Sequence, residues 1–288
     1  MKIWRFKSVS WVCDQTRVMG IINLSQDSFS EPQKSGSGLR VRNVIERACQ
    51  CLTEGADILD LGAESTRPGA DPVPFEVERD RLLPILRLLR KETKIPISID
   101  TTKPAVAEIC LSEGADIIND VSGLNDSGRD MADLVRAFEA GYVLMHRRGG
   151  PKTMQQLTDY PCGVEDMVAE LNANYLRALE WGIPREQIVL DPGIGFAKTG
   201  GQNLEILRAL EKIEALGRPV LLGYSRKSFI GGITGRSDAG EREFGTAALT
   251  AYAVMKKIPL IRVHNVGAAK DVISMIQAIQ EEKYVRSF

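Results

Sequence analysis

The sequence has few of the histidines and cysteines that build metal centres and disulfide frameworks, and it lacks the long apolar runs of membrane spans. It has only two histidines and five cysteines in 288 residues, and none of them has the spacing of a zinc site. The odd number of cysteines, with Cys49 and Cys51 too close for a Cys-x-x-Cys motif, predicts reduced thiols in a cytoplasmic protein. No apolar run is as long as a membrane span, and the N-terminal residues lack the apolar core of a signal peptide.

The chain also has no large excess of positive or negative residues. The formal net charge is −1 at pH 7, which argues against a general nucleic-acid-binding protein. There is no Walker lysine motif, and residues 193–195 lack the third glycine of a dinucleotide fingerprint. Hydrophobic residues make up 43% and charged residues 26% of the chain, without a low-complexity linker. We therefore expect one soluble domain over residues 1–288 that binds small molecules rather than nucleic acid or membranes.

Short apolar runs alternate with helical stretches along most of the chain. Eight runs have the length of short buried strands, namely residues 18–22, 58–61, 95–99, 117–118, 142–145, 188–190, 220–222 and 260–263. We expect helices over residues 40–54, 75–91, 104–113, 131–140, 164–181, 203–216, 246–257 and 268–281. This alternation predicts a parallel sheet, and eight such units in a chain of this length predict a closed (β/α)8 barrel of the TIM-barrel type.

Several further stretches have recognisable patterns. Residues 2–12 alternate apolar and polar side chains, which predicts a small hairpin or plug at the bottom of the barrel. The sequence Glu-Gly-Ala-Asp-Ile occurs at residues 54–58 and again at 113–117, and both copies are expected to end a helix and start a strand. The loop over residues 23–38, rich in serine, glycine and proline, is a candidate lid, and residues 147–160 are a second candidate.

Polar residues stand at or just beyond the ends of the eight predicted strands. They are Asn23, Asp60, Asp100, Asn119, His146, Asp191, Lys227 and His264. In a parallel barrel the C-terminal strand ends surround one mouth, so these side chains are expected to converge on one pocket. We expect Asp60 to be structural, as a helix cap or as the partner of a barrel lysine. Asp100 and Asp191, each followed by a turn, are expected to join Asn119 in binding a flat nitrogen heterocycle.

Cationic side chains gather near the last two strand ends. They are Arg226, Lys227, Arg262 and His264, and Arg67 adds a fifth candidate. Arg262 and His264 are two residues apart on one strand, so they share a face and suit an anion at the rim. His264 has a second interpretation as a general base. Lys227 fits either a Schiff base or a hydrogen-bond donor to a heterocycle carbonyl, and residue chemistry alone leaves both open.

Eight motifs in a fixed order resemble those of the dihydropteroate synthase family of the folate pathway. The resemblance runs from about Arg17 to the last helix, and each motif falls at a predicted strand end. The motifs are Met19–Asn23 with Asp27–Ser30, Glu64–Gly69, Ser98–Thr101, Ile118–Asp120, Met145-His146, Asp191–Phe196, Ser225–Ser228 and Arg262–His264. Any one of them is a weak signal, whereas eight in order form a specific one.

The resemblance implies a reaction in which 7,8-dihydropterin-6-ylmethyl diphosphate and 4-aminobenzoate give 7,8-dihydropteroate and diphosphate. It implies a dissociative mechanism, in which diphosphate leaves before the arylamine attacks. It also implies Mg²⁺ held by the substrate phosphate and Asn23, and a homodimer formed through the C-terminal helices.

The resemblance also implies roles for individual residues. The pterin would contact Asp100, Asn119, Met145, Asp191, Phe196 and Lys227. The diphosphate would contact Asn23, Arg67, Arg262 and His264, and the aminobenzoate would contact Phe29, Thr66, Arg67, Pro68, Lys227 and Ser228. The residues expected to act in catalysis are Asp100, Lys227, Arg262 and His264.

The loop over residues 23–38, called the first loop below, departs from the family pattern. Residues 24–26 read Leu-Ser-Gln where the family has Val-Thr-Pro, and residues 31–34 replace a glycine pair. Because this loop helps close the site over aminobenzoate, we hypothesise reduced sensitivity to sulfonamides, which mimic that substrate. Two rival functions are a methyltetrahydrofolate-dependent methyltransferase of the same barrel type and a non-catalytic pterin-binding protein. The methyltransferase would not need the motifs at residues 225–227 and 262–264, so their presence favours the synthase.

Overall fold

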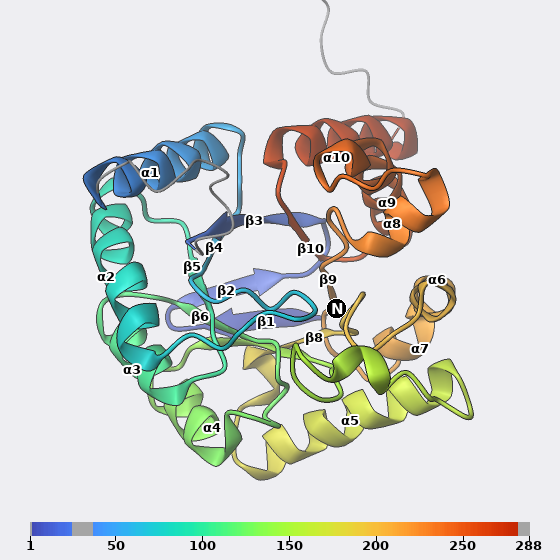
Figure 1. The fold of residues 1–288 in the computed structure, drawn as a ribbon, viewed down its shortest axis with the longest axis horizontal. Coiled ribbons are helices and arrows are strands. Elements are labelled where there is room, and N and C mark those ends of the chain that lie inside the picture. Colours follow the sequence, from blue (N-terminus) through green and yellow to red (C-terminus); the bar gives the residue numbers. More distant parts are fainter. Residues whose placement is uncertain (1, 25–36, 282–288) are drawn as a thin grey trace, which may run out of the picture.

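Eight parallel strands form a closed barrel in the computed structural model, which describes residues 2–24 and 37–281 (Figure 1). The strands follow the order β8-β7-β6-β5-β4-β3-β10-β9, and a parallel bridge between Leu190 and Val220 closes the ring. Their bounds are β3 Arg17–Asn23, β4 Ile58–Gly62, β5 Ile97–Asp100, β6 Ile117–Asp120, β7 Gly141–Met145, β8 Ile188–Asp191, β9 Leu221–Leu222 and β10 Leu260–Val263. The predicted (β/α)8 barrel is confirmed.

Helices surround the barrel (Figure 1). They are α1 Ser37–Thr53, α2 Phe75–Glu92, α3 Pro104–Ser112, α4 Gly128–Ala137, α5 Val164–Glu180, α6 Gly200–Arg208, α7 Leu210–Glu214, α8 Ser228–Thr234, α9 Glu243–Met255 and α10 Val266–Glu281. The prediction of a single helix over residues 203–216 is wrong in two respects. The observed helix begins at Gly200, because Thr199 and Gln202 form a capping box. The helical segment is also divided at Ala209, whose ψ of 28° departs from helical geometry. Sequence reasoning also missed α8, which contains two adjacent glycines that weaken the helical signal.

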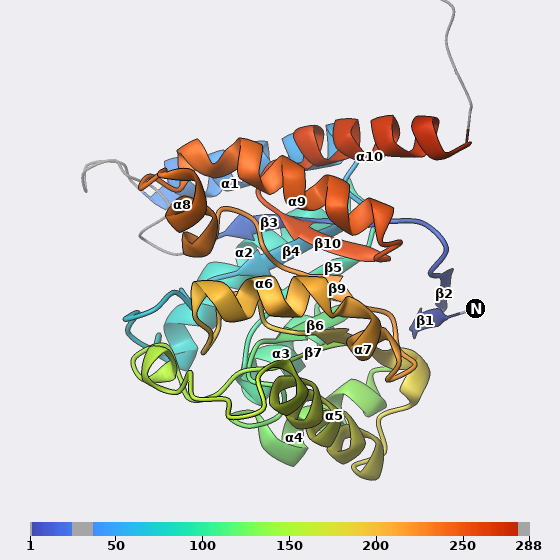
Figure 2. The same cartoon turned by 90° about the vertical axis from the view of Figure 1, so that its right-hand side faces the viewer.

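The N-terminal hairpin closes one end of the barrel (Figure 2). It consists of β1 Ile3–Phe6 and β2 Val9–Val12, paired antiparallel. Trp4 and Phe6 are buried against the apolar side chains of Met19, Ile58, Ile117, Val143, Val189, Leu221 and Leu260. The indole N–H of Trp4 donates a hydrogen bond of 2.8 Å to the carbonyl of Gln187. The predicted plug is therefore confirmed, and the opposite end of the barrel is left for the polar strand ends.

The sequence repeat has a structural counterpart. In the first copy, the carboxylate of Asp57 accepts a hydrogen bond of 2.7 Å from the main-chain N–H of Val18 in β3. In the second copy, the carboxylate of Asp116 accepts a hydrogen bond of 2.9 Å from the main-chain N–H of Ile97 in β5. The glycine of each copy has a positive φ, as a helix end requires. Each copy therefore ends a helix and fixes the start of a strand against its neighbour.

Candidate active site

Buried polar side chains from four strands meet at the C-terminal end of the barrel. The Nε of Arg262 donates to an oxygen of Asp60 over 2.6 Å, and its terminal nitrogen Nη2 donates to Asp100 over 2.8 Å. The amide of Asn119 donates to the same Asp60 oxygen over 3.2 Å. The convergence predicted for Asp100 and Asn119 is therefore present, and both residues stand beside each other in the register of β5 and β6.

Arg262, which the sequence analysis assigned to an anion at the rim, is paired with acids of the protein in this structure. Its guanidinium bridges two carboxylates inside the barrel, although 20% of the side chain remains exposed. Asp60 is fully buried, and the partner that it finds is this arginine rather than a lysine or a helix N-terminus. Within the described part of the chain, Oδ1 of Asp60 has no hydrogen-bond partner. The planar fork of the guanidinium explains why one side chain can hold both acids.

Burial shifts the protonation equilibria of this cluster. It raises the pKa of Asp100 to about 7, against the opposing effect of Arg262. It also raises the pKa of Asp191 to about 6, although the N–H of Gly193 and the charge of Lys227 lower it. Burial and then Arg262 lower the pKa of Lys227 to about 8. A ligand that donates hydrogen bonds to the two acids would favour their ionised forms.

The loop after β8 provides an apolar wall beside these charges. Nζ of Lys227 lies over the ring of Phe196, 4.1 Å from its centroid. Phe196 in turn belongs to a buried apolar cluster that includes Met145 and Met154. The side chain of Asp191 accepts a hydrogen bond of 2.7 Å from Gly193, which ties the acid to the turn that follows it. The site therefore combines an aromatic face with acceptors and an ammonium donor, a combination that suits a flat polar heterocycle.

His264 is neutral in this environment. Burial, followed by the positive charges of Arg226 and Arg262, lowers its pKa to about 3. The hydroxyl of Ser225 accepts the main-chain N–H of His264 and lies 3.0 Å from its Nδ1. If that hydroxyl donates to Nδ1, the ring proton is on Nε2. His264 is thus a neutral hydrogen-bond donor rather than the cation expected from the sequence, and its low pKa disfavours the general-base interpretation.

The chain matches known proteins over nearly its whole length. A family model described as "Pterin binding enzyme" covers residues 19–264. The dihydropteroate synthase of Synechocystis sp. is 43% identical over 265 residues, which span 92% of this chain and 90% of that protein. Among solved structures, the dihydropteroate synthase of Xanthomonas albilineans with 4-aminobenzoic acid superposes with a TM-score of 0.87 at 36% identity, covering 96% of both chains. The same bacterial enzyme in complex with 7,8-dihydropteroate gives a TM-score of 0.84 at 33% identity, covering 97% of this chain and 98% of that one.

The chain belongs to the dihydropteroate synthase family. Its identity to the Synechocystis protein covers most of both sequences, so the assignment applies to the whole barrel. The resemblance inferred from the eight ordered motifs is confirmed, and the protein is a transferase of folate synthesis. The match favours the synthase over the methyltransferase alternative.

The loop over residues 64–69, which carries the second of the eight motifs, lies at the rim and is tied down at both ends. Thr66 is half-buried, whereas Arg67 and Pro68 are exposed. At one end, Nζ of Lys103 forms ion pairs with Glu64 and with the fully buried Glu78 of α2. At the other end, the N–H of residue 69 donates to the carbonyl of residue 151 over 2.9 Å. The predicted aminobenzoate residues of this loop therefore stand on a fixed support at the edge of the mouth.

The structure describes three of the four remaining predicted residues. Asn23 ends β3 beside Gly62 of β4 and is half-buried. Ser228 is exposed at the start of α8. Phe29, and most of the first loop with it, lies outside the described residues. Arg226 forms an ion pair of 2.9 Å with Glu243, so it has a partner within the protein.

Within residues 2–24 and 37–281, no helix is both long and apolar enough to cross a membrane.

Sequence reasoning missed several charged residues close to the site. Lys198 is buried and follows the Asp191–Phe196 motif, but a lysine in a loop carries no sequence signal for burial. Glu170 lies on α5 and contacts His146, whose place at a strand end was noted without a role. Lys103 and Glu78 are a third case, because their ion pair joins residues on different elements. Such pairings depend on how the helices pack and have no local pattern.

Proposed function

We propose that this enzyme condenses 7,8-dihydropterin-6-ylmethyl diphosphate with 4-aminobenzoate to form 7,8-dihydropteroate and diphosphate. The observation that carries the proposal is the combination of Asp100, Asn119, Asp191 and Lys227 at one barrel mouth. Carboxylates accept the N–H groups of a pterin, and the ammonium donates to its carbonyl. The ligands of the Xanthomonas structures, 4-aminobenzoic acid and 7,8-dihydropteroate, support the same reaction.

The proposed mechanism is dissociative. The bond between the methylene carbon and the diphosphate oxygen breaks first, and its electron pair leaves with the diphosphate. The cation that remains is delocalised over the pterin, where the negative charge of Asp100 stabilises it. The arylamine lone pair then forms the new C–N bond, and the amine releases a proton. Lys227 serves as a hydrogen-bond donor in this scheme, since no step requires a Schiff base.

Four residues are proposed to hold the diphosphate: Asn23, Arg67, Arg262 and His264. Arg262 is already paired with two acids, so its main effect would be to hold Asp100 in place and to offer its remaining donors. Neutral His264 would donate a hydrogen bond from Nε2. Thr66, Arg67, Pro68, Lys227 and Ser228, with Phe29 of the first loop, are proposed to line the aminobenzoate side.

We propose Mg²⁺ as the cofactor, with Asn23 as its protein ligand. Among the described residues, no three His, Cys, Asp or Glu side chains gather where they could hold a metal ion by themselves. Mg²⁺ commonly binds through one or two protein oxygens while substrate phosphates and waters complete its shell, so a single amide oxygen fits. When bound, the ion would stabilise the charge of the departing diphosphate. The half-buried Asn23 at the end of β3 would orient that complex.

A direct assay tests the proposed reaction. Purified protein is mixed with dihydropterin diphosphate, 4-aminobenzoate and Mg²⁺, and the release of diphosphate and dihydropteroate is measured. We expect product that depends on all three components. Tight pterin binding without product would instead support the non-catalytic pterin-binding protein.

Pterin affinity is expected to fall as the pH is lowered. The free site has raised pKa values, about 7 for Asp100 and about 6 for Asp191. Because hydrogen bonds from the pterin favour the ionised acids, the ligand must displace protons below these values. The dissociation constant should therefore rise at least about tenfold between pH 7 and pH 5. Calorimetry at several pH values in this range measures how the dissociation constant changes with pH, after correction for the protonation of the pterin itself. An affinity that does not change with pH would contradict these roles of Asp100 and Asp191.

We also propose reduced sulfonamide sensitivity, based on the altered sequence of the first loop. The inhibition constant of a sulfonamide is expected to exceed the Michaelis constant for aminobenzoate by roughly tenfold, a difference that a few changed contacts can produce. Initial rates at varied aminobenzoate and sulfonamide measure both constants. Potent, simple competitive inhibition would refute the hypothesis.

We propose that the enzyme is a homodimer in the cytoplasm. Apolar side chains are exposed on the three C-terminal helices, at Ile233, Phe244, Met255, Met275 and Ile279. Phe244 is 91% exposed, which is unusual for an aromatic side chain without a partner. Phe244→Asp should raise the dimer dissociation constant by at least about tenfold in sedimentation experiments. Leu157→Asp, on another face, serves as the control, and a wild-type monomer would contradict the proposal.

A further inference from the structure

A chain of three buried or half-buried side chains supports the loop after β8. Lys198 is 3% exposed, and its Nζ donates to the carbonyls of Gly193 over 3.0 Å and Phe196 over 2.9 Å. The same Nζ lies 2.9 Å from Nδ1 of His146. On its other side, Nε2 of His146 lies 3.0 Å from a carboxylate oxygen of Glu170 on α5. The lysine therefore joins two points of the loop to the end of β7 and to a helix.

The hydrogen-bond directions in this chain are fixed by chemistry. Burial raises the pKa of Glu170, but its hydrogen bonds with His146 and Arg148 lower it to about 2, so its ionised carboxylate can only accept and Nε2 of His146 must donate to it. Nδ1 of the neutral ring then accepts from Nζ of Lys198, whose pKa is lowered by burial to about 7. The single proton of the neutral imidazole is then on Nε2, which donates to Glu170. Burial, followed by the charge of Lys198, lowers the pKa of His146 to about 4, which agrees with a neutral ring. All three donors of the ammonium are used, so the contacts hold one geometry.

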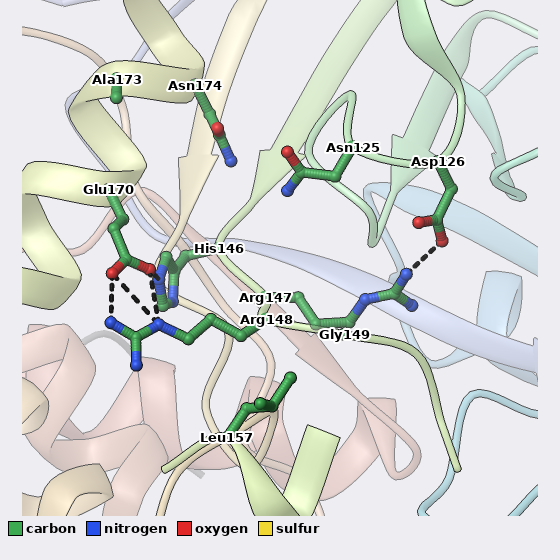
Figure 3. A pocket seen from close by; sticks show the side chains of 10 residues that line it. All are labelled: Asn125, Asp126, His146, Arg147, Arg148, Gly149, Leu157, Glu170, Ala173 and Asn174. Atoms are coloured by element: carbon green, nitrogen blue, oxygen red, sulfur yellow. Dashed lines mark hydrogen bonds and ion pairs between the residues drawn. The ribbon is translucent and has the colours of Figure 1, made fainter. Parts of the chain in front are cut away.

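Glu170, at the outer end of these three hydrogen-bonded side chains, lines a hollow of about 420 Å³ beside the barrel mouth (Figure 3). There Arg148 forms a two-pronged ion pair with Glu170. The guanidinium of Arg148 also stacks on the ring of Tyr160, 3.8 Å from its centroid. Glu170 is thereby held in place for His146, and the strength of the chain does not depend on a freely rotating carboxylate.

The supported loop has a backbone that needs such restraint. Gly193, Gly195 and Ala197 all have positive φ values, and Ala197 has a Cβ that disfavours this region. Gly193 also approaches β7 so closely that an added Cβ would lie 2.0 Å from the carbonyl oxygen of His146. Residues in such conformations persist only where their surroundings determine them. The two carbonyls held by Lys198 lie within this segment.

We propose that Lys198 is a positioning residue that fixes residues 193–196, and through them Asp191 and Phe196, in the orientation required for pterin binding. His146 and Glu170 act as its support. The inference rests on the proposed pterin contacts of Asp191 and Phe196, since Lys198 itself does not reach the substrate. Its effect should therefore be largest on the pterin side of the site, because none of the proposed aminobenzoate residues lies within residues 193–196, and Thr66, Arg67 and Pro68 stand on a different loop with its own anchor at Lys103.

The test is Lys198→Met, which keeps the length of the side chain and removes its donors. We expect the Kd and the Michaelis constant for the pterin to rise at least about tenfold, since misplacement by a fraction of an ångström weakens every contact of a rigid ligand. The Michaelis constant for aminobenzoate should stay within about twofold. The control is Lys212→Met, because Lys212 forms its ion pair with Glu165 on the surface. A lower melting temperature with unchanged Michaelis constants for the folded protein would overturn the proposal.

A second pair of variants decides the question if Lys198→Met does not fold. His146→Gln keeps an acceptor for the ammonium, whereas His146→Leu removes it. We expect His146→Leu to bind pterin several-fold more weakly than His146→Gln, and equal affinities would overturn the proposal. A wild-type protein that binds no pterin would refute the proposed function itself. Wild-type binding together with unaffected variants would refute only the role of Lys198.

Discussion

Replacing Asp100 by asparagine is expected to lower kcat/KM for the dihydropterin diphosphate by about 10³-fold. Asp100 gives one carboxylate oxygen to Arg262, and among the described residues its other oxygen accepts no hydrogen bond. That oxygen is available to a pterin N–H, and the negative charge lies where the proposed cation develops. Asparagine keeps the shape of the side chain but removes the charge, so both pterin binding and the chemical step should suffer.

The two effects can be separated by experiment. Equilibrium binding of the pterin measures the lost hydrogen bond, whereas single-turnover rates measure the loss of cation stabilisation. We expect the single-turnover rate to fall by more than the affinity, because the charge is most valuable in the transition state. A loss in kcat/KM below about tenfold would contradict the role given to Asp100.

Asp120→Asn is the matched control for this substitution. Asp120 is a fully buried carboxylate one residue after Asn119 on β6, and it accepts hydrogen bonds from Tyr142 and Ser127. Alternation along the strand directs it away from Asn119, into the scaffold. The asparagine variant should be less stable, but its folded fraction should keep the wild-type Michaelis constant for the pterin. An equal loss of activity in both variants would mean that Asp100 acts through stability alone.

The strand ends could be predicted from the sequence because apolar runs and the polar residues after them are local features. Asp100, Asn119 and Asp191 follow such runs directly, and the parallel barrel then brings them together. The sequence also predicted that Arg262 and His264 share a face, but not which groups that face would meet. The ion pair of Arg262 with Asp60 joins residues 202 positions apart, and only the closed barrel creates it.

The charged groups around the site were harder to predict for a related reason. Whether a lysine is buried depends on the carbonyls that happen to surround it. Lys198 finds its carbonyl partners in its own loop, but only because that loop adopts several positive φ values. The protonation of His264 likewise depends on its burial and on Arg226, neither of which its sequence neighbours reveal, as well as on the neighbouring Arg262. Local patterns therefore predicted most of the elements and the strand ends, whereas α8, the pairings and the protonation states required the packed structure.

Arg262→Met is expected to destabilise the protein by about 3–5 kcal/mol, because it leaves two buried carboxylates without their common partner. Arg262 opposes the rise in the pKa of Asp100, so its loss should raise that pKa further above the unfolded value. A group with a raised folded pKa stabilises the protein at low pH and loses that contribution as the pH increases. The loss in the free energy of unfolding, relative to the wild type, should therefore be smaller at pH 5 than at pH 8.

Urea unfolding of the variants at both pH values measures this effect. Arg262→Met combined with Asp60→Asn should recover part of the lost stability, because one fewer charge is buried. Arg218→Met is the matched control: Arg218 is also buried, but it donates to the carbonyls of Ile188 and Ile3 rather than to acids. Its deficit should not depend on pH in this range, since no carboxylate loses its partner. A pH-independent deficit in Arg262→Met, with no recovery in the double variant, would mean that the arginine stabilises the barrel through packing and not by neutralising Asp60 and Asp100.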